Sequence, residues 1–156
     1  MSQMNGSGVA VDVPPGWEGR IYAKPQQGPR AEGLSTSSEP NAVVHVASFP
    51  LPPGTGDYGG GAVEQMTNTD LLVVLLEHGR QSANTPLFAS IGIPKLTIED
   101  ISTTCLQRLI EGQAGAQKFF TVNGRAFCLY VVFGSYARRG RTLPVVNDIL
   151  KSLSIT

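Results

Sequence analysis

A glycine-rich run in the first half of the chain has the spacing of a dinucleotide-binding fingerprint. Gly54, Gly56 and Gly59 follow an apolar segment, and Glu77 ends the next one, about 20 residues further on, where the fingerprint places its acidic residue. In that motif a tight turn leaves the strand directly, and a long helix presents its N-terminus to the pyrophosphate. Here three prolines intervene, and the stretch before the next strand is too short for a crossover helix. We therefore interpret the run as a flexible surface loop and not as a cofactor site.

Three arginines near the end of the chain offer a place for an anion. Arg138, Arg139 and Arg141 precede the segment that we expect to form the last helix, and helix N-termini attract anions through unpaired N–H groups and the helix dipole. A phosphate group or an acidic partner would fit there. The alternative is a solvated turn whose charges keep the protein soluble, and the overall charge balance favours it.

The histidines and cysteines lack the spacing of a metal site or a nucleophile. His45 lies within a valine-rich segment and His78 at a strand end, without helical H-x-x-x-H or H-E-x-x-H spacing. Both are expected to be structural. Cys105 and Cys128 lie in segments that we interpret as core-facing, so buried free thiols are expected, with a disulfide open only if their strands are neighbours. The sequence assigns no catalytic residue, no metal ligand and no cofactor.

Apolar residues beside the Gly/Pro-rich loop are candidates for contact with a partner. Phe49, Leu51 and Tyr58 would form an apolar rim suited to association if they are exposed. Trp17 follows a Pro-Pro-Gly turn, where a packed corner aromatic is the expectation and a binding hot spot the alternative.

The composition argues against partners that need a strong charge. Twelve Lys and Arg balance twelve Asp and Glu, so no global field draws the chain to nucleic acid or to an anionic membrane. Apolar residues make up 41% of the chain, and the longest apolar run, residues 71–76, is far shorter than a membrane helix. The first residues carry no positive charge and no apolar run, so we expect no leader peptide and a cytoplasmic location.

The apolar pattern predicts a mostly antiparallel sheet followed by a helix. Strands are expected at residues 9–13, 20–23, 42–49, 71–76, 96–98, 105–111, 116–122 and 125–133. Asn123 and Gly124 tolerate the positive φ of a type I′ turn and predict a hairpin between the last two strands. Thr142 is expected to cap a helix with its apolar face toward the sheet. The predicted fold class is α+β, one domain over residues 1–156 with a C-terminal helix packed on the sheet and a mobile loop at about 24–41.

Two short motifs bracket nearly the whole chain and resemble a known fold. They are Val11-Asp12-Val13-Pro14-Pro15-Gly16-Trp17 near the start and Val146-Asn147-Asp148-Ile149-Leu150-Lys151-Ser152-Leu153 near the end. With the intervening hairpin they are similar to the PsbP/Mog-like fold family. The resemblance implies an antiparallel sheet sandwiched by helices, and non-enzymatic roles: a photosystem accessory subunit, a Ran-binding factor and bacterial proteins of unassigned role. It implies no functional residue for this chain, and the expected lack of a leader departs from the exported members.

Two functions remain open at this level. The first is a non-enzymatic module that binds a protein partner or associates with itself, which fits the dispersed polar groups and the loops flanked by aromatic residues. The second is a small-ligand-binding or enzymatic domain with a pocket between sheet and helix, where Arg138, Arg139 or Arg141 holds an anion.

Overall fold

The computed structural model of the chain describes residues 2–24 and 41–156. In these ranges the strands are β1 (Ser2–Gly6), β2 (Val9–Val13), β3 (Glu18–Lys24), β4 (Asn41–Ala47), β5 (Leu71–His78), β6 (Ala114–Val122), β7 (Arg125–Phe133) and β8 (Ser154–Ile155). The α-helix is α1 (Arg139–Ser152). Single 3-10 turns lie at Val63–Gln65, Arg80–Ser82, Pro86–Phe88 and Ile98–Asp100.

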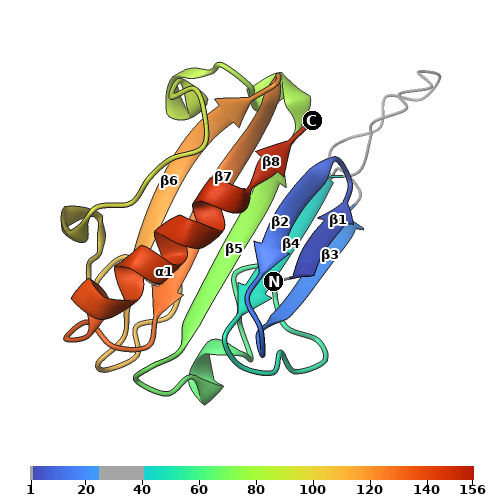
Figure 1. The fold of residues 1–156 in the computed structure, drawn as a ribbon. Helices are drawn as coiled ribbons and strands as arrows, with labels where there is room; N and C mark the ends of the chain where they lie inside the picture. Colours follow the sequence, from blue (N-terminus) through green and yellow to red (C-terminus); the bar gives the residue numbers. More distant parts are fainter. Residues whose placement is uncertain (1, 25–40) are drawn as a thin grey trace.

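Two antiparallel sheets carry the fold (Figure 1). The larger sheet has the strand order β3-β4-β5-β7-β6, and the smaller has the order β1-β2-β8. β5 lies in the middle of the larger sheet, between β4 and β7. Its run of apolar residues is buried on both faces, which is why it shows no polar alternation. The predicted α+β class, with mostly antiparallel strands and a C-terminal helix, is confirmed.

Two tight turns fix the register of the hairpins. Asn123 and Gly124 have φ of 51° and 73°, so the predicted type I′ hairpin is confirmed, with Val122 paired to Arg125. Ser7 and Gly8 also have positive φ, and they join β1 to β2. β1 had no counterpart among the predicted strands, because its residues are mostly polar and exposed.

The two faces of the larger sheet are covered differently. On one side, α1 and the smaller sheet pack against side chains such as Leu71, Val73 and Leu75; we call this the helical face. On the other side, which we call the loop face, Leu72 and Val74 are covered by the connections at residues 48–66 and 103–113. α1 is the single α-helix of the described residues, so the second helical layer that the resemblance implies is not found among them.

Helix α1 begins earlier than predicted. The helix starts at Arg139, and the Thr142 hydroxyl bonds back to the carbonyl oxygen of Arg138 at 3.3 Å instead of capping an N-terminus. Arg139 and Arg141 are therefore part of the helix and do not precede it. The apolar face is as expected, with Leu143, Val146, Ile149, Leu150 and Leu153 buried in the helical-face core.

Two predicted strands are wrong. Residues 96–98 and 105–111 lie in the long connection between β5 and β6, where isolated bridges join Ile91 to Thr121 and Ser102 to Gly115. The apolar side chain of Leu96 is buried. Its main-chain N–H and carbonyl oxygen form hydrogen bonds with the side chain of Asn147 on α1, and not with a neighbouring strand. A buried residue in a connection carries the same sequence signal as a short strand.

The predicted mobile loop at about 24–41 lies almost entirely outside the described residues. Its ends are ordered by pairing, since Lys24 and Asn41 are partners at the end of the β3–β4 ladder. Within the described ranges, no helix has the length and apolar character needed to cross a membrane.

Candidate ligand-binding site

The glycine-rich run forms a loop that lies on the loop face. It joins β4 to β5, which are antiparallel neighbours, and it is followed by a single 3-10 turn where the fingerprint requires a long helix. The interpretation as a loop is confirmed. Gly59 has φ of 87°, and a Cβ at this position would overlap Leu72 Cδ2. A glycine is therefore needed here so that the loop backbone can lie directly on the sheet.

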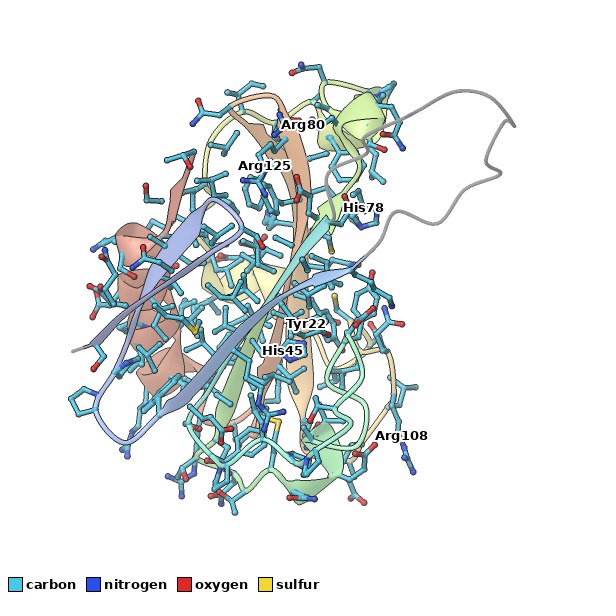
Figure 2. All side chains as sticks on the ribbon, turned by 90° about the vertical axis from the view of Figure 1, so that its right-hand side faces the viewer. Tyr22, His45, His78, Arg80, Arg108 and Arg125 are labelled. Carbon is cyan, nitrogen blue, oxygen red and sulfur yellow. The ribbon has the colours of Figure 1, made fainter. Side chains whose placement is uncertain are left out.

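Polar side chains anchor this loop to β3 and β4. The Tyr22 hydroxyl donates to Asp57 Oδ1 at 2.6 Å, and Lys24 forms an ion pair with the same carboxylate. His45 lies beside Tyr22 (Figure 2), with ring centroids 5.8 Å apart, and its Nε2 lies 2.9 Å from the carbonyl oxygen of Asp57. These contacts hold the segment that positions Tyr58.

The protonation of this cluster follows from burial and from these bonds. Burial lowers the pKa of His45 below its ordinary value, so the ring is neutral at pH 7 and Nε2 donates to the carbonyl. For Asp57, burial would raise the pKa, but the hydrogen bonds from Lys24 and Tyr22 outweigh it and hold the pKa below its ordinary value. The cluster contains a neutral imidazole and an ionised carboxylate whose oxygens already accept bonds. It acts as an anchor for the loop.

Next to this anchor, the loop face is hollowed into a pocket of about 490 Å³. We call it the loop-face pocket. Its walls are the connection at residues 56–64 on one side and residues 106–113 on the other, with β7 as its floor. The side chains that matter for its chemistry are Tyr58, Val63, Leu106, Gln113, Tyr130 and Val132.

Two tyrosines shape the apolar part of the pocket. The rings of Tyr58 and Tyr130 meet edge to face, with centroids 5.5 Å apart. The hydroxyl oxygen of Tyr130 accepts a hydrogen bond from the main-chain N–H of Gln107 at 2.8 Å, which fixes the second wall to the floor. Burial raises the pKa of both phenols, so both rings are neutral at physiological pH.

Charged side chains stand at the rim of the pocket. Arg108 Nη1 and Glu64 Oε1 come from opposite walls and form an ion pair of 2.9 Å. Figure 2 shows Arg108 on the outside of the molecule, on the side of the sheet away from α1. The pair joins the two walls at the solvent boundary and leaves no net charge there.

A second, more polar hollow of about 370 Å³ lies on the other side of Tyr58. Its lining includes Lys24, His78 and Gln81. The His78 ring packs against Phe88, with ring centroids 5.3 Å apart, and burial lowers its pKa. Among the described residues, no group of three or more His, Cys, Asp and Glu side chains is placed to hold a metal ion.

The arginines that were candidates for an anion site lie elsewhere. Arg138 and Arg141 are exposed at the start of α1. The Arg139 side chain instead contacts the nearby Tyr136. The Arg139 guanidinium lies 3.8 Å from the ring centroid of Tyr136, and its Nη1 donates to the Tyr136 carbonyl oxygen at 2.8 Å. The space between sheet and helix is filled by the helical-face core, and the loop-face pocket lies on the opposite face of the sheet.

The candidate partner-binding residues separate into two groups. Phe49 and Leu51 are buried against the loop face, so they do not form an exposed rim. Tyr58 is half-buried and lines the pocket. Trp17 is half-buried and packs against the helical-face core, as expected for a corner aromatic.

Glu77 has a structural partner. Arg125 Nε lies 2.8 Å from Glu77 Oε2, and Arg125 Nη2 lies 2.8 Å from Oε1. Arg125 also donates to the main-chain oxygens of Ser7 and Thr156, and thereby joins the two sheets. The acidic residue of the apparent fingerprint is therefore part of a buried ion pair.

The cysteines are both free thiols. Cys128 is fully buried on β7, as expected. Cys105 is half-buried in the connection before β6 and not in a core-facing strand. Burial raises the pKa of each thiol, which keeps both in the unreactive protonated form.

Sequence reasoning missed most of the pocket. Leu106 and Arg108 lie in the segment that was wrongly predicted as a strand, Gln113 lies just after it, and Tyr130 lies in a strand that was predicted only as part of the core. The local signal that was available is Glu111-Gly112-Gln113, a turn with φ of 86° at its glycine, which places Gln113 directly at the start of β6. No local pattern in the sequence indicates which segment forms the opposite wall of the pocket.

Comparison of the chain with models of protein families, with curated proteins and with solved structures finds no match in any of the three. The resemblance to the PsbP/Mog-like family therefore stays a prediction from the two short motifs.

Proposed function

We propose that this protein is a non-enzymatic binding module that takes a small, largely apolar ligand in the loop-face pocket. The observation that carries the proposal is the pocket itself: about 490 Å³ enclosed by two connections over β7, with aromatic and aliphatic side chains as its main lining. Small-molecule sites in proteins are concave, mostly apolar and roughly 300–1,000 Å³ in volume.

The walls of the pocket are held in place before any ligand binds. The first wall is anchored through Asp57 and Gly59, and the second through the bond between Gln107 and Tyr130. The ion pair between Arg108 and Glu64 joins the two. A preformed pocket loses less entropy when a ligand binds, which favours affinity.

The polar groups near the pocket support binding more than bond-making chemistry. Asp57 accepts bonds from Tyr22 and Lys24, the neutral His45 contacts a main-chain oxygen, and both pocket tyrosines are held protonated by burial. A general acid or base needs a proton to exchange near pH 7 and reach to the substrate. Asp57 and His45 hold the loop instead, and Tyr130 holds the second wall.

A thermal-shift screen tests the proposal. At ten times its Kd, a ligand of the native state adds about 1.4 kcal/mol to the free energy of unfolding, which raises the melting temperature by about 3 to 5 °C in a chain of this size. We expect such shifts for neutral compounds of one or two rings. A panel that produces no shift and no saturable change in the NMR spectrum contradicts the proposal.

A pair of variants places the binding site. Gly60 lines the pocket, and nothing lies within 4 Å of a Cβ built at this position, so Gly60→Leu adds bulk at the pocket lining from a position where the Cβ itself meets no other atom. Gly140 lies in α1, and its Cβ position is equally open. We expect Gly60→Leu to abolish the ligand-induced shift and Gly140→Leu to retain it. Equal shifts in both variants would place the ligand outside the loop-face pocket.

Association with a second copy of the chain is a second candidate, favoured by one observation. Leu87 and Ile91 are exposed in the connection after β5, Ile91 by 74%. Contiguous exposed apolar patches are typical of contact surfaces, and we propose that these two side chains belong to one. Light scattering tests this candidate: wild-type protein should form a dimer that Ile91→Ser dissociates, and a wild-type monomer at high concentration excludes it.

A further inference from the structure

Strand β3 is an edge strand of the larger sheet, and its outer side is open. It pairs with β4 on one side only, and Figure 1 shows it at the outside of the sheet, on the right. None of its seven residues is fully buried, whereas the inner strands are almost entirely buried. An open edge strand presents main-chain N–H and C=O groups with which another strand can pair.

The register of β3 and β4 shows which main-chain groups face outward. The N–H of Ala42 donates to Glu77 Oε1 on β5 at 2.9 Å, so it points away from β3. Ala23 is the partner of Ala42, and two paired residues of an antiparallel ladder exchange both hydrogen bonds or neither. The N–H and C=O of Ala23 therefore face outward, and those of Ile21 and Gly19 do so by alternation. Among the described residues, no main chain bonds to these groups.

Strand β1 covers a face of β3 and leaves its edge free. A Cβ built at Gly6 would lie 3.0 Å from Ile21 Cγ2, and one built at Gly19 would lie 2.9 Å from Met4 Sδ. Ile21 packs against the helical-face core, and the Cβ of a strand residue points out of the sheet. β1 therefore lies above the helical face of β3, and the outer edge is accessible to another strand.

Antiparallel pairing with a second copy would satisfy all of these main-chain groups. With a two-fold axis at Ile21, Gly19 of each copy lies opposite Ala23 of the other, and Ile21 lies opposite Ile21. These three residues are the ones whose N–H and C=O face outward, so each of these positions becomes a hydrogen-bonded pair. An axis at Gly19 or at Ala23 would use only part of the strand.

The charges of β3 favour the same register. Glu18 and Lys24 stand at the two ends of the strand, so an axis at Ile21 places Glu18 of each copy opposite Lys24 of the other. Their side chains are 37% and 47% exposed, and each has a partner of opposite charge in its own chain, Arg20 and Asp57 respectively. Opposite charges in facing positions stabilise a strand pair, and like charges destabilise it. Parallel pairing in register would instead bring like charges together.

The opposite edge of the larger sheet is less suited to a partner. Gly115 and Thr121, near the two ends of β6, both form main-chain hydrogen bonds with the preceding connection. Between them, only Gln117 and Phe119 face outward by alternation. A straight strand laid along β6 would overlap the connection at both ends, so β3 offers the longer open edge.

We propose that two copies of the chain form a dimer in which β3 pairs antiparallel with β3 of the second copy, around Ile21. The two larger sheets then continue into each other across the interface. A single strand pair is a small interface, so we expect a reversible dimer with a dissociation constant in the micromolar range. This surface is separate from Leu87 and Ile91, and the proposal does not depend on the loop-face pocket.

Two charge variants test the register, with sedimentation velocity as the measurement. In Glu18→Lys both facing pairs become positive, and in Lys24→Glu both become negative, so each variant alone should dimerise at least about tenfold more weakly than wild type. In an equimolar mixture opposite charges face each other again, so a heterodimer should form. Mixing could not reverse a loss of folding. Lys151→Glu makes the same charge change on α1, where the side chain is 73% exposed, and should leave the dimer unchanged.

The variant Ala23→Pro blocks the edge without breaking the ladder between β3 and β4. Ala23 is exposed and its N–H faces outward, a position at which an edge strand tolerates proline. We expect a folded monomer. In wild-type protein, hydrogen exchange of the Ile21 and Ala23 amides should slow as the protein concentration rises, while exchange at Gln117 and Phe119, on the other edge, stays unchanged.

Three outcomes would overturn the proposal. The first is a wild-type protein that stays monomeric up to about 1 mM, far above a micromolar dissociation constant. The second is a dimer that Ala23→Pro leaves intact; if Ile91→Ser dissociates that dimer, the apolar side chains after β5 form the contact instead. The third is a pair of charge variants that do not associate when mixed. The thermal-shift screen tests the loop-face pocket separately, so each of these outcomes leaves that proposal standing.

Discussion

Removing Arg125 should cost far more stability than removing any exposed arginine. The Arg125 and Glu77 side chains are only 6% and 5% exposed, and two short contacts join them. Arg125→Met removes the ion-pair partner and both of its hydrogen bonds from the buried Glu77 carboxylate, which keeps only the weaker charge interaction with Arg80. Breaking a buried pair in this way typically costs about 3 to 5 kcal/mol. The bonds from Arg125 to Ser7 and Thr156 are lost as well, so the smaller sheet should loosen first.

A matched control is available within the same chain. Arg108 and Glu64 form an ion pair of similar length, but their side chains are 68% and 32% exposed. Arg108→Met should therefore lower the free energy of unfolding by less than about 1 kcal/mol. Urea denaturation measures both variants, and hydrogen exchange reports whether the amides of β1 and β2 lose protection in Arg125→Met.

The double variant Glu77→Leu/Arg125→Met separates two free-energy terms: the cost of burying an unpaired charge, and the contribution of the ion pair to the free energy of unfolding. Replacement of both partners by apolar side chains removes the buried charge, so the double variant should be more stable than Arg125→Met alone. A loss of less than about 1 kcal/mol in Arg125→Met would refute this role of the ion pair. So would a double variant whose loss equals the sum of the losses in Arg125→Met and in Glu77→Leu alone.

Three further predictions concern pH, the helix and the glycine-rich loop. Burial alone would raise the pKa of Glu77, but Arg125 and the Ala42 N–H lower it below its ordinary value of 4.5. The ionised carboxylate therefore stabilises the fold, and protonation removes this stabilisation as the pH falls. The loss of stability in Glu77→Gln should be largest above pH 4.5 and should shrink below it. Asn147 bonds both the N–H and the carbonyl of Leu96, each at 3.0 Å, so Asn147→Leu should cost about 2 to 4 kcal/mol in urea denaturation. Gly59→Ala should cost more than about 2 kcal/mol, because of its positive φ and the overlap with the sheet.

Each of these predictions has its own control. If the loss of unfolding free energy in Glu77→Gln is the same at pH 7 and at pH 3, the lowered pKa of Glu77 is contradicted. Asp148→Ala, next to Asn147 but exposed, should be near neutral, and a similar cost in both would show that the bonds to Leu96 are not the cause. Gly60→Ala should be tolerated, since its Cβ position is open.

The sequence predicts those elements whose signals are local. The Asn123-Gly124 turn fixes its own backbone, and the residues on each side pair in the expected register. The apolar run of β5 and the amphipathic pattern of α1 likewise depend on burial at their own positions. These elements establish the fold class.

The pocket escapes prediction because it is made by contacts distant in sequence. Gln113 meets Val63, and Tyr130 meets Tyr58, and no pattern along the chain indicates either pair. The segment containing Arg108 has the apolar content of a strand, but its main chain covers the sheet as a connection. Glu77 was placed in an apparent fingerprint because its buried partner, Arg125, lies on another strand.

The most direct test of the loop-face site is to map where a ligand found by the thermal-shift screen binds, using amide NMR spectra of wild-type protein. We expect saturable shifts to concentrate at residues 56–64, 106–113 and 130–132, while the amides of the first turn of α1, around Arg139 and Arg141, stay unchanged. Shifts concentrated at α1, or spread evenly over the surface without saturation, would contradict the claim that the loop face carries the binding site.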